Sequence, residues 1–306
     1  MDGQRDGGDA EVALSVMATV VQTLFSNTRQ RGHKWELVKA LPLWELPEMV
    51  PFSHLGELVD KADPRSAQKW RTLGDYFTRP WFERVWCIQE IHMAEDSIVL
   101  CGDLDIPWYV IGVTAIWLDA QAIANDFNLP SPLADIDVSN ALYMYEGSEE
   151  LTSLLSTLSR FQDFKATGQR DKIYAILGLV NQDRVFKSIV VDYGKDTVEV
   201  YTAVIAAAIE AYGDLTVLSY VKHPMSLNME SNFPSFVPRW DACSHVMKLF
   251  DETEENLKYN ASGTRSLKSF SLSAGILKLR GFIYDTVLTK PWLSRSVQRK
   301  MANLKQ

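Results

Sequence analysis

The segment RPWFERVWCIQEI (79–91) constrains the fold more strongly than any other stretch of the sequence. Its apolar and aromatic residues surround almost the whole circumference of a helix, and its proline falls in the first helical turn, where a missing N–H is tolerated. A helix with so little polar surface is usually interior. We therefore expect one helix over 80–94, the best buried of the chain, with Trp81, Val85 and Ile88 facing the core.

A short apolar segment, SIVLC (97–101), follows this helix and ends at Gly102. Its β-branched composition predicts a buried strand. A helix followed by a strand is half of an α/β unit, so we expect the strand to lie beside the helix in an incomplete sheet of few strands. The segment ILKLRGFIYDTVL (276–288) alternates apolar and polar residues, which predicts a hairpin or a long bent strand.

Apolar spacing elsewhere is mostly helical, and the predicted fold class is α-rich α/β. Further helices are expected at 11–25, 66–77, 108–124, 151–161, 171–177 and 197–212. The buried stripe of the first should consist of Val12, Val16, Val20 and Leu24. Gly178 should supply a left-handed stop to its helix, and Gly213 should end the last one.

The charge balance excludes some partners. The chain has 306 residues, with 39 acidic against 31 basic ones and a formal charge of -8, and no Lys/Arg-rich block could follow a phosphate backbone. A nucleic-acid partner is therefore not expected. The first residues lack the basic start and apolar run of a secretory signal, and no apolar run is long enough to span a bilayer. Three widely spaced cysteines indicate reduced thiols, so we predict a cytoplasmic protein without a membrane partner.

Other patterns of chemistry-bearing residues are weak. The GKDT segment lacks the upstream glycine of a phosphate-binding loop, and the five histidines have no metal-binding spacing. Cys87, His92 and Cys101 would supply three metal ligands if they met, but buried thiols explain the cysteines better, so no metal is expected. Arg170 and Asp171 should form a capping charge and a local ion pair, with contact to a partner as the alternative.

Several segments together resemble one known family. In chain order they are RPWFERVWCIQEI, the strand ending at Cys101 with IPW at 106–108, GQRDKIYAILGL, VVDYGKDTVEVY, FPSFVPRWD and LKLRGFIYDTV. In order and spacing they are similar to the fungal heterokaryon incompatibility (HET) domain family. That family triggers growth arrest or cell death when genetically different fungal cells fuse. The resemblance therefore implies a role in non-self recognition and programmed cell death.

The resemblance covers the later part of the family pattern. The ALSYxWG-like and IDAxCINQ-like blocks with which HET domains begin are absent, which implies a chain lacking the N-terminal half of its HET domain, as a truncated product or a mis-started gene model. It further implies a partial TIR-like (flavodoxin-like) three-layer remnant, followed by a mainly helical region with a C-terminal β-hairpin. The corresponding domains are 1–128, the C-terminal part of the HET domain, and 129–306, the downstream region.

The resemblance also implies a site. RVWCIQEI is similar to the TIR helix pattern in which Trp-Cys is followed, after two residues, by the glutamate of NAD-cleaving TIR enzymes, and Trp86, Cys87 and Glu90 fall on those positions. Cleavage of the nicotinamide–ribose bond develops positive charge on the ribose, which a fixed carboxylate stabilises. Glu90 would then be catalytic and Trp86 a wall of the substrate site, with NAD as substrate and no further cofactor.

Two functions remain open at this point. The favoured one is a non-catalytic interaction or regulatory fragment that pairs with intact HET-family proteins; the alternative is an NAD-hydrolysing cell-death effector that uses Glu90. A glutamate beside a buried face is usually solvated or ion-paired, and the loops that complete a TIR-like pocket would come from the missing half. Removing half of a doubly wound sheet also uncovers an apolar edge and face, so we expect self-association or capture of a partner.

Overall fold

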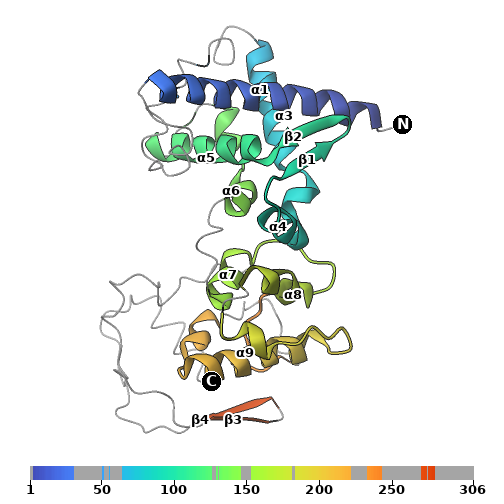
Figure 1. The fold of residues 1–306 in the computed structure, drawn as a ribbon, viewed down its shortest axis with the longest axis vertical. Helices are drawn as coiled ribbons and strands as arrows, with labels where there is room; N and C mark the ends of the chain where they lie inside the picture. Colours follow the sequence, from blue (N-terminus) through green and yellow to red (C-terminus); the bar gives the residue numbers. More distant parts are fainter. Residues whose placement is uncertain are drawn as a thin grey trace, which may run out of the picture. The chain divides into compact units, whose positions relative to one another are not determined.

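The computed structural model describes residues 3–30, 50–51, 55, 64–125, 129, 131–145, 153–180, 183–221, 233–242, 270–273 and 275–279. Over these residues the fold is mixed α/β and rich in helix, with two small antiparallel sheets (Figure 1). The chain divides into two compact units, Met1–Ala261 and Ser262–Gln306. None of the described helices is both long and apolar enough to cross a membrane.

The described elements of the first unit are mostly helices. Its α-helices are α1 (Gly3–Gln30), α3 (Pro64–Phe77), α4 (Val85–His92), α5 (Trp108–Ala124), α6 (Ser139–Tyr145), α7 (Leu154–Arg160), α8 (Asp171–Leu177) and α9 (Thr197–Tyr212). Its 3-10 helices are η4 (Pro80–Glu83), η5 (Leu133–Asp135), η6 (Gly178–Val180), η7 (Phe186–Ser188) and η8 (Thr216–Tyr220). Strands β1 (Ile98–Cys101) and β2 (Leu104–Pro107) form its sheet, and β3 (Phe270–Ser273) and β4 (Ile276–Leu279) form that of the second unit.

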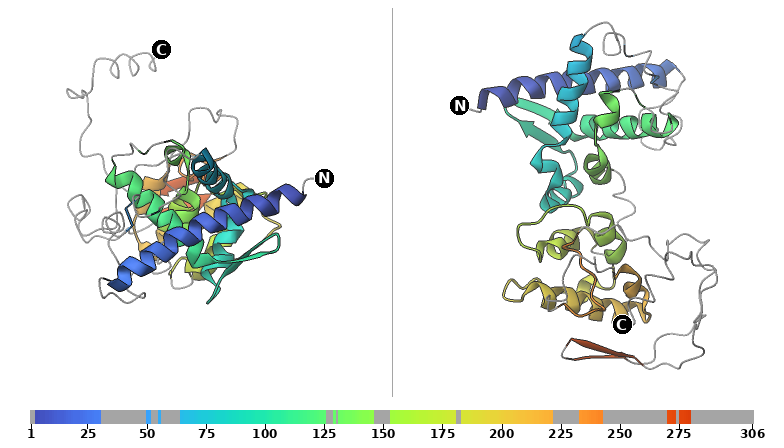
Figure 2. Two further views of the ribbon diagram at one scale, coloured as in Figure 1. Left: turned by 90° about the horizontal axis from the view of Figure 1, so that it is seen from above. Right: turned by 180° about the vertical axis from the view of Figure 1, so that it is seen from behind.

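Helix α1 packs against α3, α5 and β2 (Figure 2) and is longer than predicted at both ends. Val16, Val20 and Leu24 are buried as predicted, but Val12 is 37% exposed. Residues spaced by four advance about 40° around a helix at each step, so Val12 has drifted away from the face that buries Leu24. Ala13, which is fully buried, continues the buried face instead.

The core beneath α1 is centred on Trp117 of α5. Its fully buried ring stacks on that of Trp70 from α3, with 6.1 Å between the ring centroids. The indole Nε1 donates a hydrogen bond to the carbonyl of Val50 at 2.9 Å, and Gln121 Nε2 donates to the same oxygen at 3.0 Å. Two buried donors of α5 are therefore satisfied by a single carbonyl.

The segment RPWFERVWCIQEI (79–91), called the RPWF segment below, does not form the single helix predicted for 80–94. The 3-10 helix η4 ends before Arg84, which is extended (φ -85°, ψ 126°), and α4 begins after it. The cause is a long-range backbone contact, because Arg84 makes a parallel bridge with Lys165 and the Val85 N–H donates to the Lys165 carbonyl at 3.0 Å. Val85 and Ile88 are buried as predicted, whereas Trp81 is only half-buried.

Helix α4 is also not the best-buried helix. Every residue of α8 after Asp171 is buried, while α4 exposes Glu90 and half-exposes Trp86. Helix α8 packs against both α4 and α7, whereas α4 packs against α8, α6 and η6. The interior helix of this region is therefore α8, and the prediction that named α4 is wrong.

Strand β1 forms where predicted but is not buried. It pairs antiparallel with β2 through a tight turn in which Gly102 has φ 61°, and its residues Ile98 and Leu100 are 59% and 73% exposed. The expected α/β unit with a buried strand is thus replaced by a hairpin. The sequence carries the reason in Gly102 and Asp103, because a two-residue turn brings the chain straight back and leaves no room for a crossover.

The two predicted glycine stops behave differently. Gly213 has φ 70° and ends α9 as predicted. Gly178 has φ -61°, so it is not left-handed, and the chain continues into η6. A Cβ at Gly178 would lie 2.5 Å from Nε2 of Gln89, which shows that this glycine permits the close approach of α4 and α8 rather than a turn.

The second unit contains a described hairpin of β3 and β4, with Gly275 (φ 71°) in its turn. The strand predicted at 276–288 is confirmed over Ile276–Leu279. Its partner is the preceding strand β3, which the sequence analysis did not predict. Residues 280–288 lie outside the described part of the chain.

We predict that Gly112→Ala destabilises the first unit. Gly112 lies in α5, and a Cβ there would overlap the ring of Tyr145 at the end of α6. Overpacking of this kind costs about 1–3 kcal/mol, measurable by urea unfolding. The double variant Gly112→Ala/Tyr145→Ala removes the overlapping ring, so the alanine at 112 should cost less in that background than in wild type. Equal costs in both backgrounds would contradict the proposed close contact.

Candidate functional site

A pocket of about 540 Å³ opens beside Glu90, the residue that the sequence analysis singled out. One wall comes from the end of α4 and the residues that follow it, including Glu90 and Asp96. The opposite wall is strand β1, and Arg79 and Trp81 complete the lining with aromatic residues of α3 and η4. Its volume lies within the range of about 300–1,000 Å³ that small-molecule sites occupy.

Glu90 itself is exposed at the margin of a buried helix. Its neighbour Cys87 is fully buried. Burial raises the pKa of the Cys87 thiol to about 11, and the negative charge of Glu90 and a hydrogen bond with it act in the same direction, against the opposing effect of Arg84. Cys87 is therefore a protonated thiol at neutral pH and not a nucleophile.

Trp86 lies half-buried outside the lining of this pocket. The pocket opens at the carboxyl end of α4, one turn beyond Trp86, so the two predicted site residues are not brought together in it. Trp81, which was predicted to face the core, provides an aromatic wall instead. Its ring lies edge-on against Phe82 and Trp108, with centroids 5.1 and 5.9 Å away.

Arg79 is the basic group of the pocket lining. Its Nη1 donates to the Cys101 sulfur at 2.6 Å, and its guanidinium lies 5.0 Å from the centre of the Tyr76 ring. Burial raises the pKa of the Tyr76 hydroxyl, so that side chain stays neutral. These residues carry no sequence signal for a shared site, because the hairpin and the turn before η4 bring them together over a long sequence separation.

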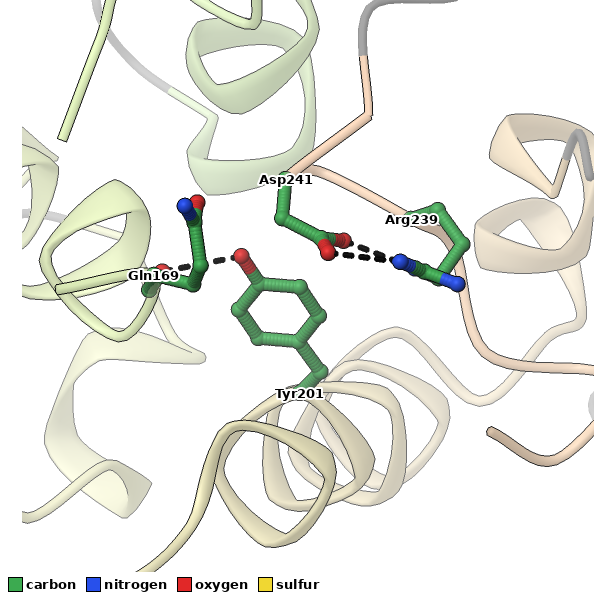
Figure 3. A network of polar contacts seen from close by, with 4 residues as sticks. All are labelled: Gln169, Tyr201, Arg239 and Asp241. Atoms are coloured by element: carbon green, nitrogen blue, oxygen red, sulfur yellow. Dashed lines mark hydrogen bonds and ion pairs between the residues drawn. The ribbon is translucent and has the colours of Figure 1, made fainter. Parts of the chain in front are cut away.

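A second polar network joins three of the segments that carry the family resemblance (Figure 3). Arg239 makes a two-pronged ion pair with Asp241, with Nε–Oδ1 and Nη2–Oδ2 distances of 2.8 and 2.7 Å. The Tyr201 hydroxyl donates to the Gln169 carbonyl at 2.9 Å, and its ring lies edge-on to Trp240. This network ties FPSFVPRWD to α9 and to the start of GQRDKIYAILGL.

Arg170 and Asp171 do not form the predicted local ion pair; among the described residues none joins them. Arg170 Nη1 donates to the carbonyls of Tyr193 and Lys195 at 2.5 and 2.6 Å. Asp171 accepts a hydrogen bond from the Tyr193 hydroxyl at 2.8 Å. Both side chains therefore hold the turn that precedes α9, whose N-cap Asp196 accepts from the Glu199 N–H at 2.8 Å. That capping box occupies the GKDT segment.

His92 lies in an apolar environment beside a cation. Within the described residues no three or more His, Cys, Asp or Glu side chains are grouped so that they could hold a metal ion. His92 instead lies beside Phe161 and Arg160, and its Nε2 is buried without a hydrogen-bond partner. Burial, helped by the charge of Arg160, lowers the pKa of His92 to about 4.

We predict that Asp241→Asn destabilises the chain by about 3–5 kcal/mol, because it leaves the guanidinium of Arg239 buried and unpaired. The side chains of this pair are 9% and 13% exposed. The matched control is Glu83→Gln, which breaks the ion pair with Lys165, where the side chains are 36% and 71% exposed. The control should cost less than about 1 kcal/mol. Urea unfolding measures both, and similar costs would refute the buried network.

We predict that His92 makes stability fall in mild acid. Its pKa is about 4 in the fold against 6.5 ordinarily, so between these pH values the unfolded chain binds the extra proton. The free energy of unfolding therefore falls as the pH drops from 6.5 towards 4. His92→Gln should lose less stability than wild type between pH 7 and pH 5 in urea titrations. Parallel losses in the two proteins would show that His92 is not buried in its neutral form.

With this geometry established, we compared the chain with known proteins. No protein-family model, no curated protein and no solved structure matches it.

Proposed function

We propose that this chain is a HET-family protein of fungal non-self recognition and programmed cell death, which acts in the cytoplasm by binding other proteins and not by catalysis. One observation supports the family relation above the others: four of the segments that carry the resemblance, RPWFERVWCIQEI, GQRDKIYAILGL, VVDYGKDTVEVY and FPSFVPRWD, are linked by contacts. Helix α4 packs on α8, Arg170 binds the turn at Tyr193, and Tyr201 contacts both Gln169 and Trp240. Because these segments contact one another, they have a physical reason to occur together in the family pattern.

The proposal includes a domain division, with the C-terminal part of a HET domain over 1–128 and the family's downstream region over 129–306. Within the first, α4 would be the remnant of a TIR-like three-layer fold. The position of Glu90 supports this assignment, because it lies at the carboxyl end of α4 and lines a pocket. Strands β1 and β2 pair antiparallel, whereas the sheet of a TIR-like fold is parallel. The proposed remnant therefore includes helices and not this hairpin.

Exposed apolar residues support the interaction role. Ile98 and Leu100 on β1 are 59% and 73% exposed, and Val190, Val191 and Tyr193 are exposed before α9. Exposed apolar residues that follow one another along the chain are typical of surfaces where other proteins bind. The proposed partners are other HET-family or incompatibility proteins, or a second copy of this chain.

A second function is favoured by the pocket itself. Glu90, Arg79 and Trp81 meet there, and a carboxylate beside an aromatic wall is suited to the positive charge that develops on ribose when NAD is cleaved. In this alternative NAD is the substrate, Glu90 stabilises the oxocarbenium-like transition state, and Arg79 offers a guanidinium to a phosphate. Trp81, rather than Trp86, would then be the aromatic wall.

Expression in a fungal host together with an intact HET-domain protein separates these functions. Viability and cellular NAD are measured for wild type, for Glu90→Gln, and for Glu210→Gln as a matched control on an exposed part of α9. We expect the chain to change the viability response equally in all three forms, with no NAD loss attributable to it, because binding does not require the carboxylate. NAD loss that disappears only in Glu90→Gln would establish the enzymatic alternative, and an unchanged viability response in all forms would refute the family role.

A further inference from the structure

Strand β1 pairs with β2 along one edge, and among the described residues no strand covers its other edge. The Trp108 N–H donates to the Ser97 carbonyl at 2.8 Å. Since hydrogen-bonded and non-bonded pairs alternate along an antiparallel ladder, Val99–Ile106 and Cys101–Leu104 are also bonded pairs. Ile98 and Leu100 therefore occupy the non-bonded positions, with their N–H and C=O groups directed away from β2.

Within the described residues, the N–H and C=O of Ile98 and Leu100 have no backbone partner. Their side chains are also the most exposed apolar ones of the hairpin, at 59% and 73%. Strand β2 differs, since it packs against α1 and α5. The sheet thus leaves an apolar edge without the lysine or proline that usually blocks pairing.

The pocket lies along this same edge. All four residues of β1 line it, from both faces of the strand, and no residue of β2 does. The opposite wall is the end of α4, with Glu90, Ile91 and Ala94. A space bounded by a strand edge on one side and a helix on the other is a groove that can hold one further strand, about 4.8 Å from β1.

The groove is acidic at both ends. Glu95 and Asp96 are exposed just before β1, and Asp103 is exposed in the turn just after it, while Asp105 is exposed on β2 opposite Leu100. Glu90 adds a further exposed carboxylate to the wall. Arg79, the basic residue of the lining, already donates to the Cys101 sulfur and lies against Tyr76. A second copy of β1 would place carboxylates against carboxylates, so charge selects a basic partner over self-pairing.

We infer that this groove binds an extended segment of another protein as an added β-strand, and that the segment has apolar residues at its centre and Lys or Arg on both sides. The backbone groups of Ile98 and Leu100 hold the segment by hydrogen bonds, its apolar side chains cover those of Ile98 and Leu100, and its basic residues meet the flanking carboxylates. The inference deepens the proposed function and rests on it for the kind of partner: a protein of the same response.

The test is a selection of random octapeptides displayed on phage against the purified full chain. We expect enriched peptides with alternating apolar residues between basic ones, and no enrichment after Glu95→Lys/Asp96→Lys. Selected peptides are then synthesised and their affinities measured by fluorescence anisotropy. Failure to enrich any peptide, or enrichment of acidic or proline-rich ones, overturns the proposal.

Two variants decide whether the peptide binds as a strand. Leu100→Pro removes an outward N–H but no β1–β2 ladder bond, and should weaken binding at least tenfold. N-methylation of the peptide supplies the same test without altering the protein: alternate methylated positions should weaken binding at least tenfold, and the positions between them by less than twofold. Equal effects at all positions refute strand addition. These affinities are measured on the purified chain, so they are independent of the viability and NAD results that test the proposed function.

Discussion

The main-chain bridge between Arg84 and Lys165 is the contact on which the arrangement of the first unit depends. It interrupts the RPWF segment, turns α4 away from η4 and brings the residues before α8 against it. Helices α4 and α8 approach closely at Gly178, where a Cβ would lie 2.5 Å from the end of the Gln89 side chain. With α4 fixed in this way, Val85, Cys87 and Ile88 are core residues, and Glu90 is left at the rim of a pocket.

Local patterns predicted the local structure well. Helices α3, α5 and α9 begin and end close to where spacing, Pro107 and Gly213 indicated, because amphipathic spacing and capping act within a few residues. The errors occurred where distant contacts decide the outcome. The bridge to Lys165 broke a helix that looked continuous, and the turn at Gly102 converted a strand expected to be buried into an exposed hairpin.

In the candidate site, too, local features could be predicted from the sequence and features that depend on distant contacts could not. Glu90 could be singled out from the sequence because RVWCIQEI resembles the TIR helix pattern, in which a glutamate occupies its position. Arg79, Asp96 and Cys101 could not, because only the folded hairpin brings them to the same pocket. Three of the segments that carry the HET resemblance are joined by the hydrogen bond of Tyr201 to Gln169 and by the ring contact of Tyr201 with Trp240, so these residues have a structural role.

Among the described residues, β1 presents an unpaired apolar edge to a pocket bounded by α4. Amide hydrogen exchange of the isolated chain, resolved by residue with NMR, tests it most directly. We expect slow exchange at Val99 and Cys101, whose N–H groups face β2. At Ile98 and Leu100 we expect exchange close to the unprotected rate. Strong protection at Ile98 and Leu100 in the absence of any partner would show that the edge of β1 is already covered, and no added strand could then pair with it.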